Sequence, residues 1–175
     1  MNIQNKSSKN SLEFKSIDYH LQPYTNPELI KENGPQVFRS GRGVEVKDID
    51  GNSYIEGMSG LWCASLGFNE IELVEAAITQ MKKLPFYHSF TGKTCESTIN
   101  LSEKLIEVAP NNLKKIFFCN SGSEANDTAI KIVWYYHASL GNPQKRKIIS
   151  RKGSYHGVTL AAASLTALDL SLIHV

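Results

Sequence analysis

The sequence has no long hydrophobic run. No uninterrupted apolar stretch approaches the roughly 18 residues that a membrane-spanning helix needs. It also has little excess charge, with 19 Lys and Arg against 17 Asp and Glu and a formal net charge of +2. These two absences give no reason to expect a membrane or a nucleic acid as a partner. Residues 1–16 contain no apolar core, which predicts a loose tail rather than a signal peptide. A transit peptide is the weaker alternative, since these residues include no arginine.

Cysteine is also scarce, and its spacing indicates neither a disulfide framework nor a metal site. Cys63, Cys95 and Cys119 are an odd number without a short pairing, and none of the 5 histidines stands at zinc spacing from a cysteine. Such thiols are typical of a reducing compartment. We therefore predict a cytoplasmic protein with no structural metal.

The first half of the chain predicts a hairpin and two helices. Alternating apolar residues on both sides of Asp48–Asn52 favour a hairpin with an Asp-Gly turn. Asn69, with a glutamate three residues later, is expected to cap a helix that Pro85 ends. A second helix is expected over 96–108, before Pro110. Residues 17–40 show little periodicity and are expected to be irregular.

The second half predicts a parallel α/β arrangement. The apolar segment 116–119 is expected as a strand, followed by a helix from Gly122 to about Leu140, a strand over 147–150 and a helix from residue 158. A β-α-β order calls for a right-handed crossover in a parallel sheet. Two such strands are too few for a sheet that needs both faces covered, so we expect only part of an α/β domain here.

The turn Ser121-Gly122-Ser123 joins the expected strand to the helix and is suited to bind an anion. A helix start offers unpaired N–H groups and the positive end of the helix dipole, so a phosphate fits there without a lysine. The sequence matches neither a Walker loop nor a dinucleotide fingerprint. The alternative is an ordinary glycine turn with a serine cap.

Several aromatic residues could lie near this turn. Tyr155 and His156 follow the next expected strand, where open α/β sheets bind ligands, and a ring beside a phosphate site suits a flat phosphorylated cofactor. Taken singly, Tyr155, Tyr24 and Phe90 could equally be packing residues, and Trp62 could wall a pocket or fill a core.

Taken together, these segments resemble the class III pyridoxal-phosphate aminotransferases, over about residues 18–167. The residues that carry the resemblance are SGSEAN at 121–126 with TAIK at 128–131, SYHG at 154–157, DGNSYIEG at 50–57, GLWC at 60–63, QM at 80–81 and LPFY at 84–87. The segment HLQPYTN at 20–26 is similar to the entry segment of the ω-transaminase branch.

The resemblance implies a fold class, a cofactor and site residues. The fold would be the α/β architecture of fold type I aminotransferases, here incomplete, in a homodimer with active sites at the subunit interface. Ser121, Gly122 and Ser123 would bind the phosphate of pyridoxal 5'-phosphate, and Tyr155 would stack on its pyridine ring. The substrate pocket would be lined by Trp62, Tyr24 and Phe90.

The family also needs a lysine that bonds to the cofactor and an acid that pairs with the pyridine nitrogen, both well beyond the Tyr-His-Gly turn. None of the lysines at 93, 104, 131 and 152 matches that position, so no catalytic residue is assigned in this chain. The residues from Ala167 to Val175 do not follow the family pattern. A truncated or frameshifted reading frame would explain both departures, and we expect the chain alone to be inactive.

The expected organisation is a tail over 1–16, a small-domain segment with the hairpin over 17–65, and the start of the large cofactor-binding domain over 66–175. The intact protein would move an amino group from an amine or ω-amino acid to a keto acid such as pyruvate. Two alternatives remain open: another reaction on the same scaffold, such as an aminomutase, racemase or decarboxylating transaminase, or a non-catalytic binding or dimerisation module.

Overall fold

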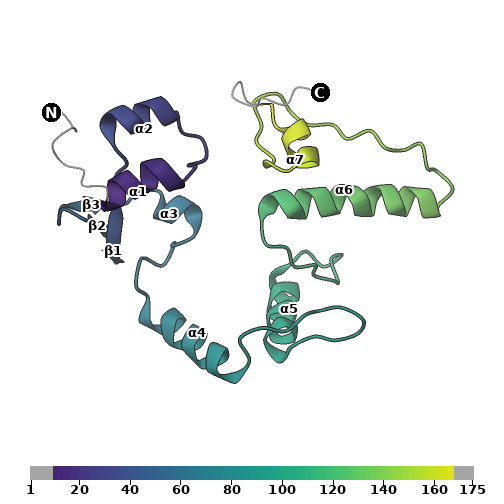
Figure 1. Ribbon diagram of the computed structural model, residues 1–175. Coiled ribbons are helices and arrows are strands. Elements are labelled where there is room, and N and C mark those ends of the chain that lie inside the picture. Colours follow the sequence, from purple (N-terminus) through teal and green to yellow (C-terminus); the bar gives the residue numbers. More distant parts are fainter. Residues whose placement is uncertain (1–9, 168–175) are drawn as a thin grey trace. The chain divides into compact units, whose positions relative to one another are not determined.

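A computed structural model describes residues 10–167 of the chain. The chain forms two compact units, Met1–Tyr87 and His88–Val175, which are described separately (Figure 1). The described residues include no helix that is both long and apolar enough to cross a membrane.

The first unit begins with two short capped helices, α1 (Leu12–Tyr19) and α2 (Pro27–Asn33). The Ser11 hydroxyl accepts the Phe14 N–H at 3.1 Å, and the Asn26 side chain accepts the Glu28 N–H at 3.0 Å. Both are ordinary N-caps. Residues 12–16, which we expected in a loose tail, thus lie in a helix, and so do residues 27–33, which we expected to be irregular.

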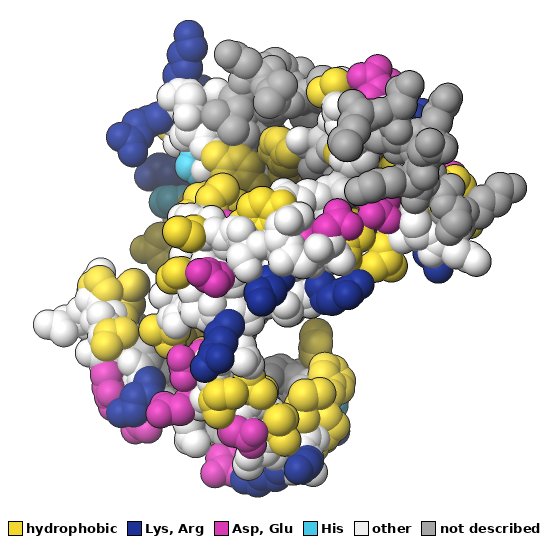
Figure 2. Space-filling model, turned by 90° about the vertical axis from the view of Figure 1, so that its left-hand side faces the viewer, with side chains coloured by type: hydrophobic (Ala, Val, Ile, Leu, Met, Phe, Trp, Pro, Cys, Tyr) yellow, Lys and Arg dark blue, Asp and Glu magenta, His cyan; other side chains and the backbone are white. Residues whose placement is uncertain are grey.

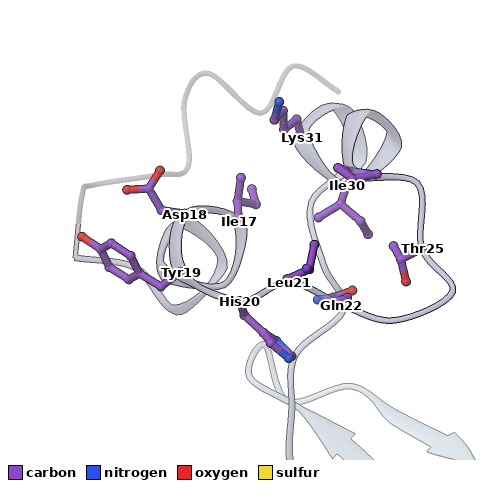
Figure 3. A pocket seen from close by; sticks show the side chains of 10 residues that line it. Ile17, Asp18, Tyr19, His20, Leu21, Gln22, Thr25, Ile30 and Lys31 are labelled. Atoms are coloured by element: carbon purple, nitrogen blue, oxygen red, sulfur yellow. The ribbon is translucent and has the colours of Figure 1, made fainter. Parts of the chain in front are cut away.

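A hollow of about 270 Å³ lies between these two helices (Figure 3). Ile17, Leu21 and Ile30 project into the space between them, and His20 and Gln22 border it from the connecting segment. This hollow belongs to the first unit alone.

A three-stranded antiparallel sheet follows, in the order β1 (Phe38–Arg42), β2 (Glu45–Asp48) and β3 (Ser53–Ile55). The hairpin of β2 and β3 was predicted and is confirmed. The added strand β1 was not predicted.

One carboxylate fixes the turn of this hairpin. Asp48 is buried and accepts the Asp50 and Asn52 backbone N–H groups at 3.0 and 2.8 Å. It also accepts the Asn52 side-chain amide and the Tyr54 hydroxyl, both at 2.9 Å. These hydrogen bonds, the one from the Asn52 side chain first, lower the pKa of Asp48 against the opposing effect of burial.

The rest of the first unit is a tight turn and a longer helix, α3 (Ser59–Trp62) and α4 (Ile71–Lys83). Residues in α3 have left-handed backbone angles, including Leu61 with φ 59° and Trp62 with φ 69°. The predicted cap of α4 is wrong. Asn69 has φ 61°, and the cap position is held by Glu70, which makes no side-chain capping bond.

The second unit contains α5 (Glu96–Val108), α6 (Gly122–Ser139) and α7 (Leu160–Leu165). The prediction of α5 and α6 is confirmed, and α7 starts two residues later than expected. After α6 the chain runs back along this helix (Figure 1), where the Trp134 indole N–H donates to the Arg146 carbonyl at 3.0 Å.

The prediction of two parallel strands is wrong for the described residues. Segments 116–119 and 147–150 have no regular secondary structure, and the one sheet among residues 10–167 is that of β1–β3. A strand is defined by backbone hydrogen bonds to a neighbour, and neither segment has one within the described residues.

Little of the apolar surface is buried within the described residues. The buried hydrophobic side chains are Val46 of β2, Ile130 of α6, and Ala162 and Ala163 of α7. Many large hydrophobic side chains instead reach the surface (Figure 2). Individual exposed apolar residues are normal, but so many together indicate faces that need further covering.

Candidate functional site

The start of α6 is a capped helix terminus. Ser121 holds the N-cap position, and its hydroxyl accepts the Glu124 N–H at 3.1 Å. The Glu124 carboxylate reaches back to the Asn120 N–H at 3.0 Å. This reciprocal pair is a variant of the capping box. The Ser-x-x-Glu spacing of this pair is a sequence signal for the start of a helix.

Two amides remain for a ligand at this terminus. Gly122 and Ser123 are the first two residues of α6, so their N–H groups have no acceptor within the helix. No acceptor for them is found elsewhere in residues 10–167. A Cβ at Gly122 would meet no atom within 4 Å, so the space beside its Cα is open.

The two serine hydroxyls can add to these donors. Ser121 Oγ accepts the Glu124 N–H, and Ser123 Oγ accepts the Val158 N–H at 3.0 Å. A hydroxyl that accepts an N–H can still donate its own O–H. The turn therefore offers two amides and two hydroxyls as donors, a set that suits a phosphate group.

The second predicted turn lies against the first, as expected. The Asn126 side-chain amide donates to the His156 carbonyl at 2.6 Å, and Ser123 binds Val158 as described. Gly157 between these contacts has φ +131°, and a Cβ there would lie 2.5 Å from Ser123 Oγ and 2.9 Å from Ala162 Cβ. Glycine therefore allows the close approach of the two turns.

Thr166 closes the second turn from the other side. Its hydroxyl accepts the His156 N–H at 2.9 Å and lies 3.1 Å from the Gly157 carbonyl oxygen. The backbone adds a pair of hydrogen bonds, from Gly153 N–H to the Ala167 carbonyl and from Ala167 N–H to the Ser154 carbonyl. Tyr155 lies inside this closed turn, yet 54% of it remains exposed. More than half of this residue is therefore accessible to a ligand.

A hollow of about 350 Å³ lies beside the start of α6. It is lined by residues of α6 and of the preceding segment, namely Phe117, Phe118, Cys119, Asn120, Glu124, Asp127, Thr128 and Lys131. Ser121, Gly122 and Ser123 are not among the residues that line it.

The three aromatic residues predicted for a substrate pocket are all highly exposed. Tyr24 and Trp62 lie in the first unit, with exposed fractions of 70% and 77%, and Phe90 lies in the second with 75%. Tyr24 and Trp62 also have left-handed backbone angles, with φ 51° and 69°.

The comparisons with known proteins place these features in one family. The family model described as "Aminotransferase class-III" matches residues 30–171, which is most of the chain. The chain therefore belongs to the class III aminotransferases. The prediction from the sequence motifs is thereby confirmed, and so is the expectation of a pyridoxal-phosphate family.

Particular relatives are similar over large parts of this chain. It is 50% identical to a vanillin aminotransferase of Capsicum frutescens over 77% of its length, and 44% identical to the mitochondrial gamma-aminobutyrate transaminase 1 of Oryza sativa subsp. japonica over 91%. The chain covers 29% and 31% of these two relatives.

A solved structure gives the same assignment. The omega transaminase of Pseudomonas jessenii, in complex with PMP, is 52% identical, with a TM-score of 0.90 over 93% of this chain and 36% of that one. The fold type I assignment is confirmed by this likeness. The chain spans about a third of the length of the relatives it matches.

Proposed function

We propose that the protein is a transaminase that uses pyridoxal 5'-phosphate to move an amino group from an amine or ω-amino acid to a keto acid. The observation that supports this most directly is the joined pair of turns, in which the donors at the start of α6 lie against the turn that carries Tyr155. The names of the relatives, which are transaminases of vanillin, of gamma-aminobutyrate and of the omega class, agree with it.

The phosphate group is assigned to the first turn. Gly122 and Ser123 would bind it through their amides, and the Ser121 and Ser123 hydroxyls would donate as well. The open space beside the Gly122 Cα and the absence of intrahelical acceptors for these amides fit such a group. Backbone amides can bind a phosphate without a lysine. The phosphate would then anchor the cofactor to this turn.

Tyr155 is assigned to the pyridine ring. A flat phenol ring holds the plane of a heterocycle without adding charge. When bound, the cofactor supplies the electron sink for carbanion chemistry, and the protein orients it. The turn that carries Tyr155 is bonded to α6, so the backbone of Tyr155 is held near the proposed phosphate-binding residues.

Trp62, Tyr24 and Phe90 are assigned to the substrate pocket. The support for this assignment is their exposure and, for Trp62 and Tyr24, a left-handed backbone. Such conformations cost about 1–3 kcal/mol and cluster at functional sites. None of the chain's residues is assigned as the covalent lysine or as the acid that pairs with the pyridine nitrogen.

Two further assignments complete the proposal. We infer a homodimer, to which the many exposed apolar side chains lend support. We also infer a cytoplasmic location from the cysteine pattern, although relatives with mitochondrial and chloroplastic names make organelles the direct alternative.

Amino transfer is tested on the protein at its natural length. Incubation with pyridoxal phosphate, an amine or ω-amino acid donor and pyruvate should consume donor and acceptor in equal amounts, with alanine as a product. Omission of the cofactor or of either substrate should stop turnover. Consumption of the donor without formation of alanine would overturn transamination in favour of another reaction on the same scaffold.

A further inference from the structure

Asp127 makes two long-range hydrogen bonds that the proposed function does not yet use. Its Oδ1 accepts the Thr159 hydroxyl at 2.8 Å and the Ala162 backbone N–H at 2.9 Å. The partners are 32 and 35 residues away along the chain. The carboxylate is part-buried and joins α6 to α7 and to the segment that precedes α7.

The carboxylate serves as the missing cap of α7. Thr159 holds the N-cap position of this helix but makes no side-chain capping bond, and Ala162 is the third residue of the helix. A helix of 6 residues is not stable by itself. Asp127 therefore replaces the local cap, and the buried Ile130, Ala162 and Ala163 pack where the two helices meet.

The same contact ends a row of bonds along the second turn. His156, Val158 and Thr159 are bonded in turn to Asn126, Ser123 and Asp127 of α6. The Thr159 hydroxyl also lies 3.3 Å from the Ser123 carbonyl oxygen. Tyr155 directly precedes this row, so its position depends on how firmly the segment 156–159 is held.

We infer that Asp127 is a positioning residue, which holds the segment 156–159 on α6 and thereby sets the place of the Tyr155 ring relative to the phosphate-binding turn. This inference rests on the proposed cofactor site. No contact with the cofactor is assigned to Asp127, whose Oδ1 is engaged by Thr159 and Ala162. Its effect on cofactor binding acts through Tyr155.

A double-mutant cycle between Asp127 and Tyr155 tests this coupling. Pyridoxal phosphate is titrated into the wild type, Asp127→Ala, Tyr155→Ala and the double variant, and affinity and the induced circular dichroism of the bound cofactor are recorded. Asp127→Ala should weaken binding about tenfold, as expected for the loss of charged hydrogen bonds. In the Tyr155→Ala background the same change should weaken it by less than about twofold.

Milder variants guard against a general loss of folding. Thr159→Val removes the hydroxyl that binds Asp127 and should reproduce the altered circular dichroism, whereas Thr159→Ser should restore the wild-type signal. Glu103→Gln changes an exposed carboxylate on α5 and should alter neither affinity nor signal.

The outcomes separate the two proposals. Equal losses of affinity in both backgrounds, or a Thr159→Ser variant that behaves like Thr159→Val, would overturn the positioning role and leave the proposed function standing. A wild-type protein that binds no pyridoxal phosphate would overturn the proposed function, and the positioning role with it.

Discussion

Two aspartates hold two different regions of this molecule. Asp48 fixes the hairpin of the first unit through partners at most 6 residues away along the chain. Asp127 joins α6 and α7 of the second unit through partners 32 and 35 residues away. Both carboxylates accept backbone and side-chain donors, so the chemistry is the same and only the sequence separation differs.

This difference separates a structural region from a functional one. The loop that Asp48 closes is short, so little chain entropy is lost when its bonds form, and the turn is specified locally. The contacts of Asp127 form only after some thirty residues have folded back along α6. The long-range region is the one that brings the proposed phosphate-binding turn and Tyr155 together, so the comparison can be tested by breaking each region in turn.

Gly157→Ala should have the largest effect, because it breaks the long-range region at its closest approach. The new Cβ would overlap Ser123 Oγ and Ala162 Cβ, at a φ of +131° that only glycine adopts readily. Strain of about 1–3 kcal/mol adds to this overlap, so pyridoxal phosphate should bind roughly a hundredfold more weakly in a titration.

Gly141→Ala is the matched control. Gly141 also has positive φ, at +76°, but a Cβ there would meet nothing within 4 Å. The substitution should cost about 1–2 kcal/mol of stability from the backbone alone and leave cofactor affinity unchanged. Equal effects of the two variants on affinity would contradict the close-approach role of Gly157.

Asp48→Ala should break the local region without disturbing the proposed site. It removes the acceptor of the Asp50 and Asn52 amides and of the Tyr54 hydroxyl, so hydrogen exchange at the Asn52 amide should become much faster. Amides at the start of α6 should keep their exchange rates. Faster exchange in both regions would show that the hairpin held by Asp48 and the region held by Asp127 are not independent.

Acid should open the same hairpin in a defined direction. The bond from the Asn52 side chain, assisted by those from Tyr54 and the backbone, lowers the pKa of Asp48 in the folded state. Its contribution to stability is therefore fully present above the unfolded pKa of about 3.9 and is lost as pH falls through the lower folded value. An NMR titration of the Asn52 side-chain amide should have its midpoint below about 3.9, and a higher midpoint would contradict this.

Ser123→Ala should have a smaller effect, exerted mainly on the phosphate. It removes the acceptor of the Val158 N–H and one donor of the proposed anion site, a loss of about 1.5–3 kcal/mol if the bond is charge-assisted. Binding of pyridoxal phosphate should weaken by roughly tenfold or more, whereas binding of unphosphorylated pyridoxal should weaken less, through the loosened contact with Val158 alone. Equal losses for both ligands would place the phosphate elsewhere.

The helices and the hairpin could be predicted because their signals are local. Helix α5 has the predicted bounds Glu96–Val108, and α6 begins at the predicted Gly122. The cap of α4 failed because Asn69 adopts a left-handed backbone and leaves the position to Glu70. The preference of asparagine for helix caps is overridden at Asn69 because the chain turns there, directly after the backbone bridge between Gly43 and Phe68.

The failed strands show the limit of a local signal. Segments 116–119 and 147–150 carry the apolar pattern of buried strands, but a parallel strand exists only through hydrogen bonds to distant neighbours. None of residues 10–167 provides such a neighbour. The division into a tail, a small-domain segment and a large domain stays a prediction.

The candidate site was predicted in its parts but not in its connections. Motifs marked the turn 121–123 and Tyr155, because glycine and serine at a helix start have recognisable chemistry. Asp127 carries no such signal, since an aspartate in the second turn of a helix is usually solvated. Its role depends on α7 lying against α6, which no short pattern specifies.

The smallest expected effects come from a matched pair of variants, Tyr54→Phe and Thr159→Val. Each removes one hydroxyl hydrogen bond to an aspartate, the first to Asp48 and the second to Asp127. Tyr54→Phe keeps its edge-to-face contact with Phe38, whose ring centroid is 5.8 Å away. It should speed exchange at the Asn52 amide slightly and leave pyridoxal phosphate affinity and circular dichroism unchanged. Thr159→Val should leave exchange at the Asn52 amide unchanged but alter pyridoxal phosphate affinity and circular dichroism, because the Thr159 hydroxyl holds the segment next to Tyr155. If Tyr54→Phe altered the circular dichroism of the cofactor as much as Thr159→Val, the hairpin would be part of the site. The proposed contrast between a structural role of Asp48 and a functional role of Asp127 would then be wrong.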